Sequence, residues 1–212
     1  MNIDTEIERV AEKMRRLPPH SSARVNPPQS IVWGPPLPES RVAAYEAAHG
    51  IRLPADYRAF ITRVAGSGSH PFYGLEELGV PNSEFGEDDI NPGRPFPFTA
   101  DRPLDCWALF GEDAEDPDAG HAAFEAILEG GGAASGFIHL CHEGCGMNSI
   151  LVVNAVDPAQ EGTVWYFDLA NDAGIFPMRH EDGRALTFLS WFELWLDGEL
   201  SGEPFKGYAE LT

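Results

Sequence analysis

Four side chains of the types that bind zinc or act as nucleophiles occur within seven residues of this chain: His139, Cys141, His142 and Cys145. Thiolates and imidazoles are the ligands that zinc prefers. The spacing argues against a zinc site, because on a strand His139 and Cys141 share a face while His142 points away. No CxxC or HxxxH pair elsewhere completes a tetrahedron, so Cys106 or a distant histidine would have to be recruited. We therefore predict buried thiols and turn histidines, with no metal and no cofactor.

A cysteine nucleophile is the second chemical possibility in this stretch. It needs a thiolate beside a base that a third group orients, and Cys145 near His142 and Glu143 has the right residue types. Catalytic partners meet in space and only seldom within a single turn, so adjacency alone does not predict catalysis. The sequence also has no GxGxxG, GxxxxGK[ST], GxSxG or HExxH motif. We expect no enzyme, and keep a zinc or thiol enzyme as the least favoured alternative.

Acidic residues form the other candidate functional group. The turn from Asp113 to Asp118 suggests calcium, but the twelfth position counted from Asp113 is Phe124, where an EF-hand needs glutamate. Pro117 also interrupts the ligand spacing. The turn is therefore not predicted to be an EF-hand.

The formal net charge is −20, and it is unevenly distributed. Residues 1–63 carry nine basic and seven acidic side chains, whereas residues 64–205 carry four and 26. Such a field repels nucleic acid and anionic lipid and steers a basic macromolecule toward the protein. The simpler interpretation is solubility, because acidic surfaces keep proteins apart.

Two acidic loops are the predicted contact sites for a basic partner, because loops often carry function and charged rims set association rates. The candidate residues are Glu84, Glu87, Asp88 and Asp89 in one loop and Asp113, Glu115, Asp116 and Asp118 in the other.

The core that positions these residues is predicted within residues 136–169. Three strand-like runs bounded by turn residues suit adjacent antiparallel strands: Phe137–Cys141, Ser149–Asn154 and Thr163–Asp168. The run Ile150–Val153 has no polar alternation, which predicts a central strand covered on both faces. The glycines of Gly144–Gly146 are typical of a turn with positive φ.

Apolar periodicity and capping residues predict five helices, over residues 4–17, 38–49, 53–65, 121–129 and 186–200. Thr5 and Glu8 are placed as a capping box for the first helix, and Thr187 and Ser190 as caps of the last. In the second helix, Val42, Tyr45 and Ala48 are expected to face inward.

The remaining segments are predicted to be connections. Residues 18–30 are rich in proline and serine, so the first helix is expected to dock loosely. Residues 72–75 are predicted to be a short strand, and residues 81–105 and 170–184 to be surface loops. Phe96, Phe98 and Trp107 are expected to pin the first of these loops to the core. If they were exposed, they would instead form a binding patch.

The chain has 212 residues, 43% of them hydrophobic, which suits one folded domain. Three cysteines fit a reducing compartment better than a disulfide framework. No apolar run approaches the length of a membrane span, and the first residues, MNIDTEIERV, are acidic where a secretory signal is basic. We expect a cytoplasmic protein.

An ordered series of segments resembles the SUKH superfamily, of the Smi/Knr cell-wall assembly regulator type. The series comprises Trp33, LPADYRAF at 53–60, FYGL at 72–75, PFPF at 95–98, GFIHLCHEGCG at 136–146, ILVV at 150–153, GTVWYFD at 162–168 and TFLSWFELWLDGEL at 187–200. Order and spacing carry the resemblance over roughly residues 31–200. Residues 1–30 then form an N-terminal helix and linker, 31–200 the domain, and 201–212 a tail.

The resemblance implies an α+β domain with a twisted antiparallel sheet, helices packed against it and no enzyme activity. Many bacterial members resemble immunity proteins that neutralise a cognate toxin, often a nuclease. Fungal relatives are regulatory binding proteins. We therefore expect a protein-binding module with a basic toxin as its partner; the alternative is a regulatory or scaffold protein without a toxin.

Overall fold

The two faces of the run Ile150–Val153 lie in two different hydrophobic cores. Ile150 and Val152 belong to one core, whereas Leu151 and Val153 belong to the other. A sheet that is buried on both faces needs a layer of cover on each side. The predicted covering of both faces is therefore confirmed.

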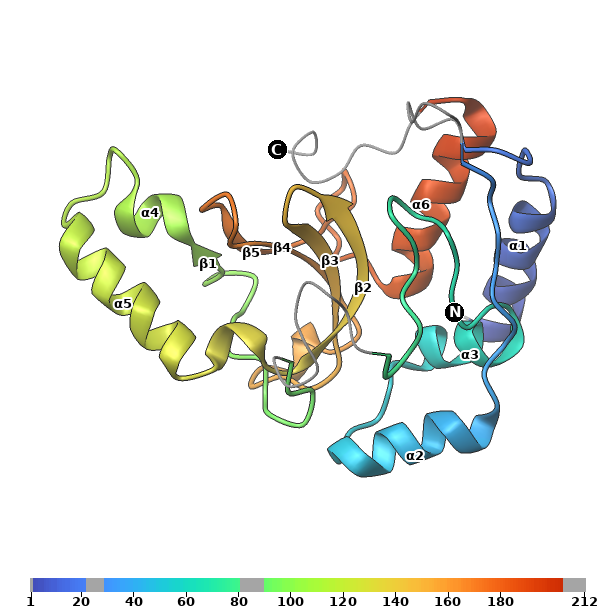
Figure 1. Cartoon of the computed structure of the whole chain (residues 1–212), viewed down its shortest axis with the longest axis horizontal. Helices are drawn as coiled ribbons and strands as arrows, with labels where there is room; N and C mark the ends of the chain where they lie inside the picture. The colour runs from blue at the N-terminus through green and yellow to red at the C-terminus, as the bar shows by residue number, and fades with distance from the viewer. Residues whose placement is uncertain (1, 22–28, 81–89, 204–212) are drawn as a thin grey trace.

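The computed structural model, which describes residues 2–21, 29–80 and 90–203, shows an α+β fold with helices on both faces of an antiparallel sheet (Figure 1). The strand order is β1-β5-β4-β3-β2. The strands are β1 (Leu104–Asp105), β2 (Phe137–Gly144), β3 (Met147–Val152), β4 (Val164–Asp168) and β5 (Gly174–Pro177). The middle strand is thus β4, and β3 lies beside it with a partner on each side.

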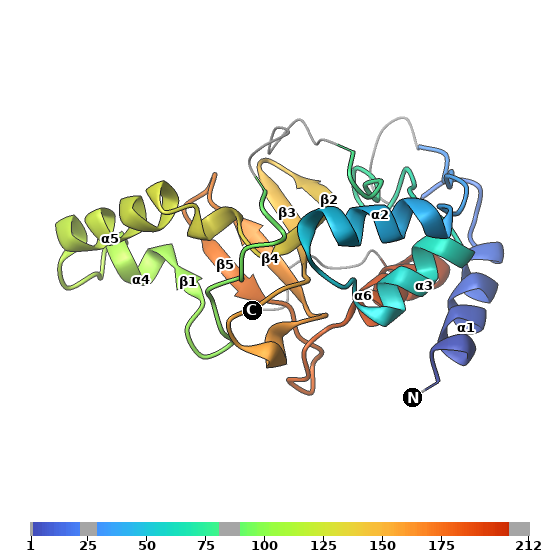
Figure 2. The same cartoon turned by 90° about the horizontal axis from the view of Figure 1, so that it is seen from below.

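Among the described residues, four helices lie on one side of the sheet and two on the other (Figures 1 and 2). On the first face lie α1 (Ile3–Arg15), α2 (Glu39–His49), α3 (Ala55–Arg63) and α6 (Phe188–Ser201), and on the second lie α4 (Cys106–Phe110) and α5 (Pro117–Glu129). Two short 3-10 turns, η1 (Gly132–Ala134) and η2 (Pro158–Gln160), flank the strands. The predicted fold class, an α+β domain with helices packed on an antiparallel sheet, is confirmed.

The ends of α2 and α6 follow their capping residues. Gly50 ends α2 with φ +65°, a conformation that glycine adopts without steric cost. The backbone N–H of Thr187 donates to the hydroxyl of Ser190 at 2.8 Å, which confirms the predicted caps of α6. The inward position predicted for Ala48 is wrong, because that side chain is exposed on α2.

The first helix begins one turn earlier than its predicted cap. The side chain of Asn2 accepts a hydrogen bond from the backbone N–H of Asp4 at 3.1 Å, so Asn2 is the N-cap. The predicted capping box of Thr5 and Glu8 is wrong, because both residues already lie within α1.

Ion pairs and a buried apolar contact hold α1 against α6. Val10 is fully buried. Arg9 makes two hydrogen bonds to Glu193, at 2.6 and 2.7 Å, and Lys13 bridges Glu193 and Asp197. The loose docking expected from the proline-rich linker is therefore not what the structure shows.

Residues 72–74 form a turn and Leu75 makes an isolated bridge to Gly68, so the strand predicted at 72–75 is wrong. The backbone N–H of Tyr73 donates to the carbonyl of His142 at 3.1 Å, and that of Glu76 donates to the carbonyl of Leu140 at 2.8 Å. These single bonds cover the outer edge of β2 without forming a continuous ladder. Of the residues that suggested a strand, Leu75 is buried and Phe72 packs against the first core, whereas Tyr73 is exposed.

The segment after residue 90 agrees with prediction only in part. Phe96 and Phe98 are buried and fix the loop to the second core, as predicted. Trp107 is 63% exposed, so its predicted burial is wrong. It lies in α4, a helix of five residues.

The predicted polar loop over residues 170–184 contains strand β5. Phe176 pairs with Tyr166 of β4, and Ile175 pairs with Phe167 of β4 and Leu104 of β1. A four-residue strand has little local signal, because its hydrogen-bonding partners are supplied by distant segments.

Candidate protein-binding surface

The β2–β3 hairpin separates the residues that suggested a metal site. The pairing of β2 with β3 is irregular at two places. One register shift lies between His139 and Cys141, and the other lies between His142 and Gly144. His139 pairs with Ile150, whereas Cys141 pairs with Ser149, the next position along β3. Because side chains alternate along a strand, the extra residue puts His139 and Cys141 on opposite faces. The prediction that they share a face is wrong.

His139 is held in the sheet by Asn148. Its Nε2 lies 2.8 Å from Oδ1 of Asn148, whose amide nitrogen donates to the carbonyl of Gly146 at 2.9 Å. Burial lowers the pKa of His139 to about 4. The imidazole is thus neutral near pH 7 and supports the turn.

Glu143 is the partly buried carboxylic acid of this hairpin. The hydroxyl of Ser149 donates a hydrogen bond to it. Burial raises the pKa of Glu143 to about 7, and the negative charge of Asp168 acts in the same direction. Asp168 accepts hydrogen bonds from the backbone and side-chain nitrogens of Asn171. The carboxyl groups of Glu143 and Asp168 therefore both have hydrogen-bond donors within the protein.

Cys145 lies exposed at the tip of the hairpin. Its φ is +52°, between Gly144 at +106° and Gly146 at +81°, which confirms the predicted positive-φ turn. Nε2 of His142 accepts the backbone N–H of Gly146 at 3.4 Å. Burial raises the pKa of the other local thiol, Cys141, well above its ordinary value and keeps it protonated.

Over residues 2–21, 29–80 and 90–203, no three histidine, cysteine, aspartate or glutamate side chains lie close enough together to hold a metal ion.

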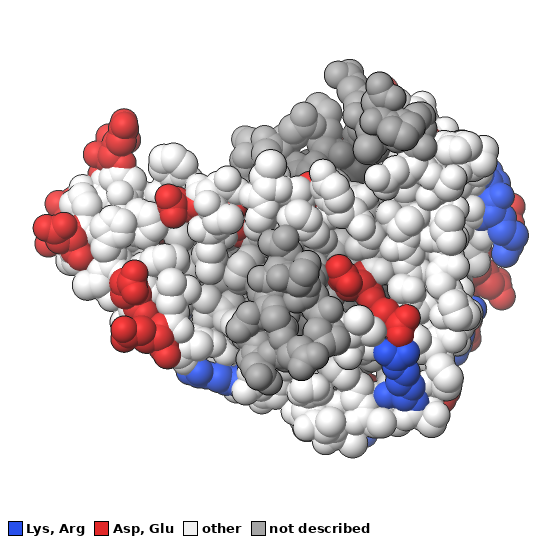
Figure 3. Space-filling view, in the orientation of Figure 1, with Lys and Arg blue, Asp and Glu red and all other residues white. Residues whose placement is uncertain are grey.

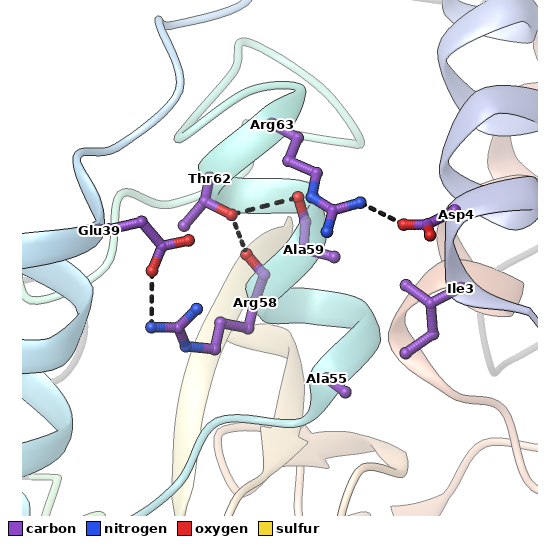
Figure 4. Close-up of a pocket in the computed structure, with 8 residues that line it drawn as sticks. All are labelled: Ile3, Asp4, Glu39, Ala55, Arg58, Ala59, Thr62 and Arg63. Carbon is purple, nitrogen blue, oxygen red and sulfur yellow. Dashed lines mark hydrogen bonds and ion pairs between the residues drawn. The ribbon is translucent and has the colours of Figure 1, made fainter.

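A surface hollow of about 370 Å³ lies between the first turn of α1 and helices α2 and α3 (Figure 4). Its two cations are paired: Arg58 lies 2.7 Å from Glu39, and Arg63 pairs with Asp4. The hydroxyl of Thr62 donates back to its own helix at 2.8 Å. Because its polar groups bind each other, this hollow offers no evident chemistry.

The α4–α5 hairpin, residues 104–129, presents the second predicted acidic loop. Asp113, Glu115, Asp116 and Asp118 are all exposed there. Asp116 also caps α5, since its side chain accepts the N–H of Ala119 at 3.1 Å. The helix therefore starts at residue 117, four residues before the predicted start.

Negative charge dominates this end of the molecule. No lysine or arginine occurs between Arg102 and Arg179 in the sequence. Figure 3 shows acidic side chains spread over the α4–α5 end, with basic ones along the lower edge and at the α1 end. The first predicted acidic loop, with Glu84, Glu87, Asp88 and Asp89, lies outside the described residues.

Trp107 is exposed on this surface, whereas the sequence predicts that it pins a loop to the core. Exposure is the condition under which it forms a binding patch. The helical spacing of α4 was the available signal, because Cys106 and Phe110 can face inward together only if Trp107 faces elsewhere.

A family model for the SMI1 / KNR4 family (SUKH-1) matches residues 36–198. The chain belongs to this family. Membership in SUKH-1 confirms the resemblance read from the ordered sequence segments. Helix α1 lies outside the matched region, and β1–β5, α2–α5 and most of α6 lie within it.

No curated protein and no solved structure matches the chain. Within the part of the chain that the structure describes, every helix is too short or too polar to cross a bilayer.

Proposed function

We propose that this SUKH-1 protein is a cytoplasmic, non-enzymatic binding module that neutralises a basic protein toxin, and so acts as an immunity protein. The observation that carries the proposal is the acidic α4–α5 hairpin, within a stretch of sequence that has no lysine or arginine. Charge of one sign on a surface favours partners of the opposite sign and accelerates encounter with them.

Two further observations support a binding role. The family fits a protein-binding module. The histidines and the partly buried acid of the β2–β3 hairpin are hydrogen-bonded to neighbouring protein groups, which leaves them poorly placed for catalysis. A nuclease toxin is a suitable partner, because a nucleic-acid-binding surface is basic and an acidic protein can cover it.

Coexpression with the toxin encoded beside the gene tests the proposal. We expect the chain to rescue growth and to co-purify with the toxin. The triple variant Asp113→Asn, Glu115→Gln, Asp118→Asn is expected to weaken the complex at least about tenfold, because it removes three charges from the proposed contact. Asp116 is left unchanged because it caps α5.

A matched control removes three exposed acids elsewhere, by Glu8→Gln, Glu181→Gln and Glu203→Gln. It changes the net charge by the same amount and is expected to bind nearly as wild type does. Absence of both rescue and complex overturns the proposed function. Equal weakening by the two triple variants shows that only total charge matters, and removes the hairpin from the proposal.

A further inference from the structure

Trp107 stands apart from the other tryptophans of the chain in its exposure. Trp165, Trp191 and Trp195 are buried, and Trp33 packs edge-on against the ring of Trp195. Trp107 is 63% exposed in the first turn of α4. A large aromatic left in water at this level is typical of an interaction site, because Trp is enriched among the residues that dominate protein interfaces.

The exposure of Trp107 follows from the way α4 packs. Cys106 is fully buried, and Leu109 and Phe110 pack against the second core. At 3.6 residues per turn, residues 106, 109 and 110 share one side of the helix, which directs residues 107 and 108 away from it. The tryptophan is therefore held in the solvent by the packing of its neighbours.

Helix α5 leaves a second apolar surface uncovered. Of its thirteen residues only Gly120 is buried, while Phe124 and Ile127 reach the second core. The exposed residues of α5 include Leu128 and three alanines, Ala122, Ala123 and Ala126, with Glu125 and Glu129 among them. Few residues of this helix are needed by the core, so much of its apolar surface faces water.

The packing of the two helices puts these apolar surfaces on one hairpin. Leu109 lies against Gly120, and the ring of Phe110 stacks on His121 at 4.3 Å. The helices run in roughly opposite directions (Figures 1 and 2), so the start of α4 lies toward the end of α5. Trp107, in the first turn of α4, therefore lies toward the end of α5, which carries Leu128.

The negative charge of the hairpin restricts which kinds of partner can cover this surface. Every charged side chain from residue 105 to residue 129 is acidic. A second copy of the hairpin brings like charges together, and nucleic acid or an anionic membrane does the same. A protein surface with lysine and arginine around an apolar pocket complements both the acidic rim and the apolar centre of the α4–α5 hairpin.

We propose that Trp107, with the exposed apolar residues of α5, is the anchor by which the α4–α5 hairpin docks into an apolar pocket ringed by basic residues on its protein partner. This inference rests on the proposed function and names the part of the surface that holds the partner. The acidic rim accelerates encounter, and the buried indole slows dissociation.

Site-specific photo-crosslinking tests the anchor. A benzoylphenylalanine is placed in the full chain at position 107, at position 115 in the acidic rim, and at Tyr73, a control residue that is 71% exposed beside the outer edge of β2. We expect positions 107 and 115, but not 73, to crosslink to one protein of net positive charge. That protein is then purified, and its Kd for the chain is measured.

Substitutions at Trp107 measure how much its side chain contributes to the affinity for the partner. Trp107→Ala is expected to raise the Kd about 10- to 100-fold, mainly through faster dissociation, whereas Trp107→Phe is expected to recover part of the affinity. Tyr73→Ala is the matched control, and its Kd is expected to stay within about twofold of wild type. Thermal melting of each variant verifies folding, which removal of an exposed side chain should leave intact.

The outcomes separate the anchor from the proposed function. Crosslinking at 115 together with an unchanged Kd for Trp107→Ala overturns the anchor and leaves the acidic contact in place. Crosslinking at 73 alone, or to an acidic protein, overturns both. Absence of crosslinking at all three positions also overturns both.

Discussion

At the scale of single residues, hydrogen bonds and burial determine what the polar side chains of the β2–β3 hairpin do. His139 and Glu143 are types that enzymes use, yet one is bound to Asn148 and the other accepts a hydrogen bond from Ser149. Their pKa values move in opposite directions because burial disfavours the charged form of each. His139 is therefore neutral above about pH 4, and Glu143 is neutral below about pH 7.

Glu143 is expected to make stability depend on pH. The folded protein keeps its proton up to about pH 7, whereas the unfolded chain releases it near pH 4.5. The stabilising effect of the protonated form is therefore complete below pH 4.5 and is lost as the pH rises through 7. We expect Glu143→Gln to raise the free energy of unfolding by about 1–3 kcal/mol at pH 8 and to change it little at pH 4.

Urea denaturation at the two pH values measures this effect, with Glu181→Gln as the control at an exposed glutamate. A gain of equal size at pH 4 and pH 8 contradicts the assignment of the pH dependence to the carboxyl group of Glu143.

At the scale of elements, the α4–α5 hairpin depends on one close approach. A methyl group added at Gly120 would clash with the backbone oxygen of Leu109, which is rigid main chain. Glycine at this position lets α5 pack directly against α4, and this packing sets the direction of Trp107. The residue is structural, but the proposed binding surface depends on it.

Gly120→Ala is expected to destabilise the protein although alanine is the better helix former. Helix propensity favours alanine by about 1 kcal/mol, whereas forcing a group into packed main chain costs about 1–3 kcal/mol and displaces the helix. The free energy of unfolding, measured by urea denaturation, and the affinity for the partner should therefore both fall. Ala122→Gly, at an exposed site of the same helix, is the control and should lose about 1 kcal/mol of stability by propensity alone. A more stable Gly120→Ala variant contradicts this account of the packing.

At the scale of the whole molecule, charge is separated along the chain. The first 63 residues carry nine basic and seven acidic side chains, and part of that positive charge pairs with acids of α6 through Arg9 and Lys13. The opposite end, with α4 and α5, retains its negative charge (Figure 3). This arrangement directs a basic partner toward the hairpin.

The rate of association with the partner is expected to fall steeply with salt. Raising the ionic strength from about 0.01 to 0.15 M shortens the screening length from about 30 to 8 Å, so long-range attraction is largely lost. Stopped-flow measurements should show the association rate constant falling at least about tenfold, with a much smaller change in dissociation. An association rate that does not depend on salt contradicts electrostatic steering.

Much of the fold could be predicted from the sequence because its signals are local. The strands at 137–144, 147–152 and 164–168 and the long helices follow from apolar spacing and from end signals such as Gly50 and Thr187. The positive-φ turn at 144–146 follows from its glycines. The acidic character of residues 64–205 is a property of composition alone.

Other features were decided only by the tertiary structure. Strand β5 exists because β1 and β4 supply its hydrogen bonds, and the irregularity in β2 that separates His139 from Cys141 has no signature in residue type. The exposure of Trp107 follows from which side of α4 the second core occupies. Periodicity shows that an element has an apolar side, but distant segments determine what covers that side, and hence which residues remain on the surface for a partner.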